Sequence, residues 1–281
     1  MKHIVSWSGG KDSTATIIVA HEMGLPIDLI IISLVWFDRK RKIYGEYPEH
    51  IAWIFNYAIP LFESWGYAVQ VVSSERDYMY YFFRTIKKSD KPERIGKHAG
   101  WLLGGRCYMN REKIAPIKKY LQNLDFEYEE YIGIAIDEPE RLARLEKQTG
   151  KRSLLAELGY TENMCLEKCR EYGLLSPLYD ISYRGGGWFC PNQKISGFAH
   201  LKQQHPILWA ELLKLSKVKN KVTEGFKYGK TFDDVSREVD AYIKNQEYRA
   251  AQLTIWDAMG VENDAQAHLC AACLAERSKQ T

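Results

Sequence analysis

The chain has 281 residues, of which 46% are hydrophobic, 13% aromatic and 27% charged, and its formal net charge is +3. This composition excludes a disordered chain, and so small a charge does not by itself predict a nucleic-acid partner. No run of 18 apolar residues occurs, so we expect no membrane span. The apolar pattern starts at once, which leaves no room for a signal peptide, and we expect a cytoplasmic protein.

Apolar segments that predict strands alternate with helical patterns in the first half of the chain. Strands are expected at residues 2–7, 27–37, 67–74 and 129–137. Helices are expected at residues 14–23, 50–66, 111–124 and 138–148, the second with a kink at Pro60. The isoleucine-rich run 27–37 is typical of a strand covered on both faces. The alternation predicts an α/β fold with a doubly wound parallel sheet, which is Rossmann-like.

Beyond Gly150 the alternation stops. Short helical patterns around two cysteines, a glycine-rich loop and longer helical stretches follow, and the tail is polar and charged. We therefore expect a nucleotide-binding domain over residues 1–150 and a helical region with a cysteine loop over 151–281.

The nucleotide prediction rests on the sequence Ser-Gly-Gly-Lys-Asp-Ser at residues 8–13, between the first strand and the first helix. Gly9 and Gly10 leave space for backbone N–H groups to converge on an anion, and the helix N-terminus adds a partial positive charge. Lys11 supplies a full charge, and the Ser8 and Ser13 hydroxyls can donate hydrogen bonds. The loop suits a phosphate or pyrophosphate. The alternative is a glycine turn with a solvated lysine.

The loop resembles that of the adenine-nucleotide alpha-hydrolase, or ATP-pyrophosphatase, superfamily, whose members cleave ATP between the alpha and beta phosphates to adenylate a substrate. Segments beginning at Phe37, Gly104, Gly133 and Ser176 resemble the phosphoadenosine phosphosulfate reductase-like branch. The resemblance covers roughly residues 2–193 and implies ATP and Mg²⁺ as ligands. It implies catalytic roles for Lys11, Asp12 and Asp137. It implies nucleotide contacts from Ser6, Ser8, Gly9, Gly10, Lys11, Asp12, Ser13, Asp38, Lys113, Gly133, Glu138 and Arg141.

Some of these residues also suggest chemistry by their own position. Asp137 and Glu138 end a predicted strand at the edge that faces a ligand cleft, where a carboxylate can hold magnesium or orient a substrate. Arg141 and Arg144 are about one helical turn apart and could clamp a phosphate or sulfate. A solvated helix face is the alternative for the two arginines.

The chain departs from the branch in two respects. Phosphosulfate reductases of the family have a degenerate first loop and a C-terminal Glu-Cys-Gly-type motif, whereas this chain keeps Lys11 and lacks that motif. Gly187 stands where the related subgroup is expected to have a cysteine that would pair with Cys190. The first departure favours ATP itself as the ligand, and the second removes one expected metal ligand.

Four cysteines are candidate metal ligands. Cys165 and Cys169 are spaced i, i+4, which places both thiols on one helix face, and Cys190 lies in a glycine loop. Cys107 stands in the segment that contributes cluster ligands in iron–sulfur members of the branch. The four could form a closed site, or three could hold a [4Fe–4S] cluster with one open iron; Zn²⁺ is equally compatible with thiolates. The alternative is that these cysteines are small buried hydrophobic residues.

The remaining signals are weaker. A Cys-x-x-Cys pair at Cys270 and Cys273 can be a redox pair, a metal site or part of a helical tail. Basic stretches at 39–42, 84–97 and 214–230 could contact nucleic acid or form a solvated face. The aromatic run 76–85 could stack a base, although such runs are more often core. His200 and His205 lack zinc-ligand spacing and are interpreted as structural.

From these observations we expect an enzyme that binds ATP and adenylates an acceptor, for sulfur transfer. DNA or tRNA is a candidate acceptor, and a homodimer is a candidate assembly. Two alternatives stay open: a reductase of an adenylylated sulfate, and a regulatory module that binds a nucleotide without turnover.

Overall fold

The computed structural model describes residues 1–103, 108–181 and 186–258. Residues 1–235 form one compact unit, and a second unit begins at Ser236. The first unit includes residues on both sides of Gly150. Among the helices of the described ranges, none is long and apolar enough to span a membrane.

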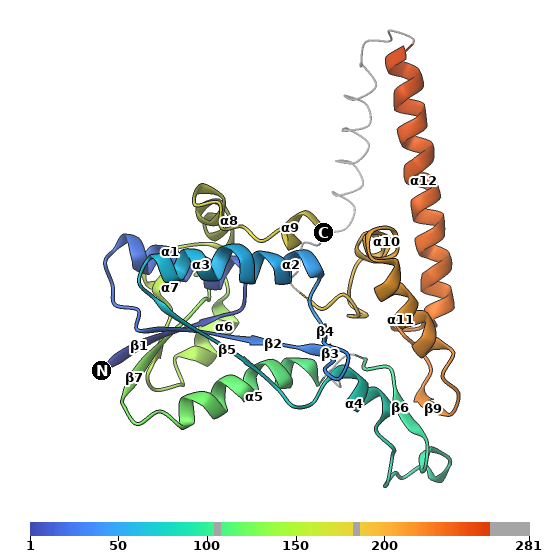
Figure 1. The fold of residues 1–281 in the computed structure, drawn as a ribbon, viewed down its shortest axis with the longest axis horizontal. Coiled ribbons are helices and arrows are strands. Elements are labelled where there is room, and N and C mark those ends of the chain that lie inside the picture. Colours follow the sequence, from blue (N-terminus) through green and yellow to red (C-terminus); the bar gives the residue numbers. More distant parts are fainter. Residues whose placement is uncertain (104–107, 182–185, 259–281) are drawn as a thin grey trace. The chain divides into compact units, whose positions relative to one another are not determined.

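A five-stranded parallel sheet forms the centre of the first unit (Figure 1). Its strands, in spatial order, are β5 (Ala68–Ser73), β2 (Leu29–Leu34), β1 (Lys2–Trp7), β7 (Tyr128–Ile132) and β8 (Lys151–Arg152). The predicted parallel α/β fold is confirmed. The short edge strand β8 was not expected, and β7 ends at Ile132 rather than at Asp137. The residues after Ile132 are therefore loop, and they reach toward α1.

Helices cover both faces of the sheet (Figure 1). On β1 and β2, alternate side chains point to opposite faces, as the pleat requires. Val5 and Ile30 pack toward α1 (Lys11–Glu22), while Ile4 and Ile31 pack with Leu121 of α5 (Met109–Gln122). This two-sided burial explains why residues 27–34 are apolar except for Asp28 and Ser33.

The first-half helices differ from the expectation in two places. Helix α1 begins at Lys11 instead of Thr14, so the loop residues Lys11, Asp12 and Ser13 form its first turn. The helix expected at 50–66 is divided into α2 (Pro48–Trp53), the π-helix η1 (Ile54–Ala58) and α3 (Ile59–Ser64). Because Pro60 has no N–H to donate to the turn before it, the helix widens there into a π-turn.

The other elements of residues 35–103 and 108–235 are short. The strands are β3 (Trp36–Asp38), β4 (Ile43–Tyr44), β6 (His98–Gly100) and β9 (Lys221–Thr223). The helices are α4 (Tyr78–Phe83), the 3-10 helix η2 (Pro92–Arg94), α6 (Pro139–Leu145), α7 (Leu154–Glu157), α8 (Glu162–Glu171), α9 (Leu178–Ile181), α10 (Ile195–Gln204) and α11 (Pro206–Ser216). Helix α12 (Phe232–Ala258) starts in the first unit.

Aromatic side chains form a second core away from the central sheet. Trp101 contacts Phe226 and Phe232, and Trp209 also packs on Phe232. In the aromatic run 76–85, Tyr78, Tyr81 and Phe82 of α4 are buried. These three residues are core, which is the more ordinary of the two interpretations of this run.

Candidate functional site

The loop at residues 8–13 lies at the carboxyl end of β1, the central strand of the sheet. The chain runs outward from β1 through β2 to β5 and then returns to β7 on the other side of β1, so the loop lies where the strand order reverses. Ligands of open α/β sheets bind at such switch points. The fold therefore places the predicted loop at the usual ligand position.

Glycine is required at residue 9. Gly9 has a φ of +73°, and a Cβ there would lie 2.6 Å from Cε1 and 2.7 Å from Nε2 of His50. Gly10 is the extended N-cap of α1, whose first-turn N–H groups have no carbonyl partner within the helix. The backbone thus opens toward a site at the helix N-terminus.

The two loop serines bond mainly within the loop. The Ser8 N–H donates to Ser13 Oγ over 3.1 Å, Ser13 Oγ donates to the Gly10 carbonyl over 3.1 Å, and the two hydroxyl oxygens are 3.0 Å apart. These contacts fix the loop, whereas the sequence pattern suggested hydroxyl donors to an anion. Ser6 lies two residues before Ser8, in β1. Its hydroxyl donates a hydrogen bond to the carboxylate of Glu130 in the neighbouring strand β7.

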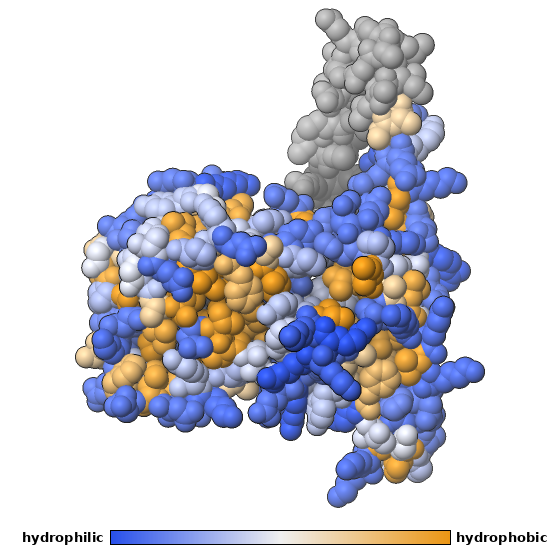
Figure 2. All heavy atoms as spheres, viewed as in Figure 1, coloured by the Kyte–Doolittle hydropathy of each residue, from blue (hydrophilic) through white to orange (hydrophobic). Residues whose placement is uncertain are grey.

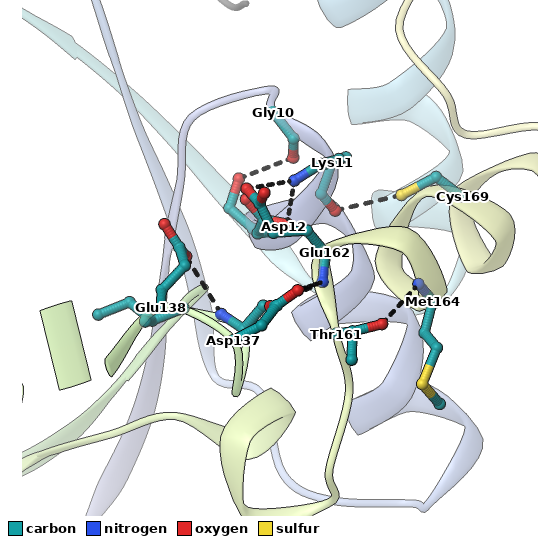
Figure 3. Close-up of polar contacts among 12 residues, drawn as sticks. Gly10, Lys11, Asp12, Asp137, Glu138, Thr161, Glu162, Met164 and Cys169 are labelled. Carbon is teal, nitrogen blue, oxygen red and sulfur yellow. Dashed lines mark hydrogen bonds and ion pairs between the residues drawn. The ribbon is translucent and has the colours of Figure 1, made fainter. Parts of the chain in front are cut away.

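Lys11 is held by two carboxylates (Figure 3). Its Nζ lies 2.7 Å from Asp12 Oδ1 and 2.9 Å from Glu162 Oε1, and its side chain is 15% exposed. Burial alone would lower the pKa of Lys11, but these hydrogen bonds and ion pairs raise it above its ordinary value. Lys11 is therefore a fixed cation. Burial raises the pKa of Asp12, and Lys11 opposes that shift.

Three carboxylates gather beside Lys11. One oxygen each of Asp12, Glu138 and Glu162 lies within 4.8 Å of the others, which is a donor set that Mg²⁺ accepts. Glu138 also binds the guanidinium of Arg141, at 2.5 and 2.7 Å. Asp137 takes another role: its carboxylate accepts the Glu162 N–H at 3.0 Å and so anchors the start of α8 (Figure 3).

A cavity of about 880 Å³ adjoins the loop. Lys11, Asp12, Arg141 and Glu162 line one part of it, and the cavity is large enough for a nucleotide-sized ligand. Lys113 also lines it and forms a 2.8 Å ion pair with the buried Glu46. The structure thus brings five of the predicted residues to one cavity: Lys11, Asp12, Lys113, Arg141 and Cys190.

Asp38 and Gly133, which are predicted to contact the nucleotide, make close contacts within the protein. Asp38 is not among the described residues that line the cavity; its carboxylate accepts the Arg41 N–H at 3.0 Å and the Arg41 Nε–H at 2.6 Å. Gly133 follows β7 and packs on the loop, where a Cβ would lie 2.5 Å from the Ser13 nitrogen. Gly133 therefore permits the close approach of two segments.

The expected cysteine site is not assembled in the described part of the chain. Cys165 and Cys169 are 0% exposed within the core between α8 and α1, and Cys190 lines the cavity. Burial raises the pKa of both core thiols to about 12, and the Cys169 thiol donates to the Lys11 carbonyl over 3.2 Å. None of the described groups of three potential ligand atoms contains a cysteine. Cys107, Cys270 and Cys273 lie outside the described residues.

Gly187 has a packing role of its own. A Cβ at this position would lie 2.7 Å from the Gly45 carbonyl oxygen and 3.1 Å from the Phe189 ring. A cysteine at residue 187 would therefore require the backbone to shift, which explains glycine there without reference to a metal.

Three residues at the loop were not predicted from the sequence: Glu162, Tyr179 and His50. The Tyr179 hydroxyl accepts the Lys11 N–H over 2.7 Å, and the His50 ring packs against Gly9 while its Nδ1 lies 2.7 Å from Ser176 Oγ. Burial lowers the pKa of His50 to about 3, so the ring is neutral. No local sequence pattern marks the contacts of Tyr179 and His50 with the loop.

Comparison of the chain with models of known protein families and with curated proteins gives no match. The class that the geometry itself defines is a parallel α/β protein with a glycine–lysine loop at the switch point of its sheet, beside a cavity lined by both acidic and basic side chains.

Proposed function

We propose that the protein is an ATP-pyrophosphatase of the adenine-nucleotide alpha-hydrolase type, in the phosphoadenosine phosphosulfate reductase-like branch. In this proposal it binds Mg–ATP and adenylates an acceptor. The observation that carries the proposal is the position of Lys11, in the first turn of α1 and at the wall of the 880 Å³ cavity.

The loop would act on the pyrophosphate part of ATP. The first-turn N–H groups and the Lys11 ammonium would face the beta and gamma phosphates. Attack of the acceptor on the alpha phosphorus breaks the bond to the beta phosphate, and negative charge grows on the departing pyrophosphate. A fixed cation and a helix N-terminus that are already in place stabilise that charge without further rearrangement.

Asp12, Glu138 and Glu162 would hold Mg²⁺. The three oxygens lie close enough to share one ion, and oxygen is the ligand that Mg²⁺ prefers. When bound, the ion neutralises phosphate charge. Asp12 and Glu162 both contact the Lys11 ammonium and so offset its charge beside the loop, which leaves less of that charge for ATP alone. We therefore expect ATP binding to depend on Mg²⁺.

Cys190 favours sulfur chemistry as the second stage, because its residue lines the same cavity as Lys11. The same observation supports the second candidate, a reductase of an adenylylated sulfate. In that case a thiolate at the cavity would attack the sulfur, forming a cysteine S-sulfonate and releasing the adenine nucleotide. A thiol of an external dithiol reductant would then attack the cysteine sulfur, forming a disulfide and releasing sulfite.

A nucleic acid is the acceptor that the surface supports. The turn between β3 and β4 carries Arg39, Lys40, Arg41 and Lys42, all exposed, and Figure 2 shows a strongly hydrophilic area over the position of these strands. Arg41 is partly engaged, since it pairs with Asp38 and Glu211. Binding to single-stranded DNA or tRNA should weaken steeply between 50 and 200 mM salt, by about tenfold or more.

Product analysis tests the proposed function. The purified protein should convert ATP to AMP and pyrophosphate in the presence of acceptor and Mg²⁺, and chelation of Mg²⁺ should stop the reaction. Nucleotide binding without pyrophosphate release under any acceptor would instead identify a regulatory module. Sulfite release from an adenylylated sulfate, lost in Cys190→Ser, would identify the reductase.

A further inference from the structure

A second group of potential ligands lies outside the loop cavity. Glu49 is in the first turn of α2, His200 is in α10, and His205 is the residue between α10 and α11. His205 Nε2 lies 2.8 Å from Glu49 Oε1, and His200 Nε2 lies 3.2 Å from the same oxygen. Two imidazole nitrogens from one helical corner thus converge on one carboxylate.

The spacing of these atoms matches a metal site. Zinc–ligand bonds of roughly 2.0–2.1 Å at tetrahedral angles place neighbouring ligand atoms about 3.3 Å apart. The three ligand atoms all lie within 4.8 Å of one another, and the two measured N···O distances are close to the expected separation. An ion could enter with only small movements of the side chains.

The Glu49 carboxylate has one oxygen that accepts no hydrogen bond from the described residues. Glu49 Oε2 is buried, and no hydrogen-bond donor among the described residues reaches it. An anionic oxygen that is buried without a partner is costly, and a cation would compensate it.

The cluster is nevertheless open to solvent on one side. The exposed fractions of the side chains are 32% for Glu49, 27% for His200 and 18% for His205. An ion can therefore reach the cluster. Three protein ligands with an exposed side leave a fourth position for water or a substrate group, which is the arrangement of catalytic zinc sites.

We propose that Glu49, His200 and His205 bind a divalent transition-metal ion, with Zn²⁺ as the expected occupant. Imidazole nitrogen and one carboxylate suit Zn²⁺ and disfavour Mg²⁺ and Ca²⁺, which take oxygen ligands. The proposal goes beyond the proposed function and does not rest on it. It also revises the interpretation of His200 and His205 as purely structural residues.

The site bears on the loop through α2. Glu49 faces α10 and α11, while the next residue, His50, packs against Gly9. An ion bound by Glu49 would fix the start of α2 to the α10–α11 corner and thereby limit the movement of His50 beneath the loop. The zinc site would then act as a positioning device for the loop.

Metal titration tests the site with full-length protein that carries no histidine tag. Chelator-treated protein should bind one equivalent of Zn²⁺ in calorimetry, and Co²⁺ in its place should give visible absorption typical of tetrahedral coordination. Glu49→Gln keeps an oxygen that accepts hydrogen bonds from both histidines but removes the charge, and His205→Asn removes a ligand. Each should weaken Zn²⁺ binding by at least about 100-fold, the upper end of what loss of a single supporting group costs.

Matched controls separate this site from other causes. Glu63→Gln, at an exposed position of α3, and His98→Asn, on β6, should bind Zn²⁺ like the wild type. Circular dichroism establishes that each variant is folded, and Glu49→Gln serves if a histidine variant is not. Absence of one-equivalent Zn²⁺ binding in the wild type would overturn the proposal. Unchanged binding in folded Glu49→Gln would also overturn it, because the ion would then be bound elsewhere in the protein.

Discussion

The first turns of α1 and α8 approach each other, and the two helices use their side chains in opposite ways. Helix α1 presents Lys11 at the cavity wall, held by polar contacts from α8 and α9. Helix α8 contributes Glu162 to the same cavity, but directs Cys165 and Cys169 into the core against α1. Helix α8 therefore turns a polar face toward the cavity and its two thiols toward the core. The i, i+4 spacing of the cysteines predicts that they share a face, but it does not predict whether that face meets a ligand or the core.

Among the substitutions that test this difference between α1 and α8, Lys11→Ala is expected to have the largest effect. It removes the fixed cation of the cavity, so ATP affinity should fall by roughly 10- to 100-fold, the value of a charged hydrogen bond, and pyrophosphate release should be nearly abolished. Calorimetry with Mg–ATP measures the first and product analysis the second. Lys118→Ala, on the exposed part of α5, is the control. Unchanged affinity in Lys11→Ala would remove the loop from the site.

His50 makes the loop region sensitive to acid. Its pKa is lowered to about 3 in the fold by burial and by the charge of Lys113, so the unfolded chain takes up a proton near pH 6.5 that the folded chain does not. The stabilisation that neutral His50 contributes to the free energy of unfolding is therefore complete above pH 6.5, and it decreases as the pH falls below 6.5. Between pH 6.5 and 5 the expected loss is about 2 kcal/mol.

Denaturant titrations at several pH values measure this loss, with His50→Gln as the variant that cannot titrate. Glu211, whose pKa is lowered to about 2 by Arg41 first and Lys214 next, contributes only below pH 4.5 and does not obscure the window. Parallel pH profiles for the wild type and a folded His50→Gln would contradict the prediction.

The cysteines of α8 should behave as core residues. Cys165→Ser places a hydroxyl in the core and should lower the free energy of unfolding by about 1–3 kcal/mol, whereas Cys165→Ala should cost less. Chemical denaturation measures both. Metal analysis of anaerobically purified protein provides the opposing test: equal loss of iron or zinc in the serine variants of Cys165, Cys169 and Cys190 would restore the shared site that the sequence suggested.

Substitutions at Gly187 and Gly186 test the packing explanation for glycine at residue 187, and they should have the smallest effects. Gly187→Cys should lower the free energy of unfolding by about 1–3 kcal/mol, because its Cβ would lie 2.7 Å from the Gly45 carbonyl oxygen. Gly186→Cys is the matched control, since its Cβ would meet only the Cys190 Cβ at 4.0 Å, and it should stay within about 0.5 kcal/mol of the wild type. Thermal unfolding ranks the two, and the reverse order would refute the packing explanation.

The sequence predicted the parts of the molecule whose signal is local. The apolar run 27–37 indicated a buried parallel strand because both faces of β2 are covered, although β2 ends at Leu34 and Trp36–Asp38 forms β3 of another sheet. The sequence at 8–13 indicated a loop between strand and helix, of which residues 8–10 are loop and residues 11–13 are the first turn of α1. Contacts over long separations had no such signal. Tyr179 reaches Lys11 across 168 positions, and Glu49 meets His205 across 156. The i, i+5 spacing of His200 and His205 concealed their convergence, because a bend between two helices turns both rings toward α2.

Gly133 shows how a loop can be constrained by a residue that meets no ligand. A Cβ at residue 133 would clash with the backbone nitrogen of Ser13, so any other residue would push the first turn of α1 outward. A saturation mutagenesis screen for activity should thus find position 133 as intolerant as position 11, although for steric reasons. In a second screen that adds substitutions at neighbouring positions, variants of residue 133 should be rescued by compensating changes, whereas the lost Lys11 ammonium has no such substitute.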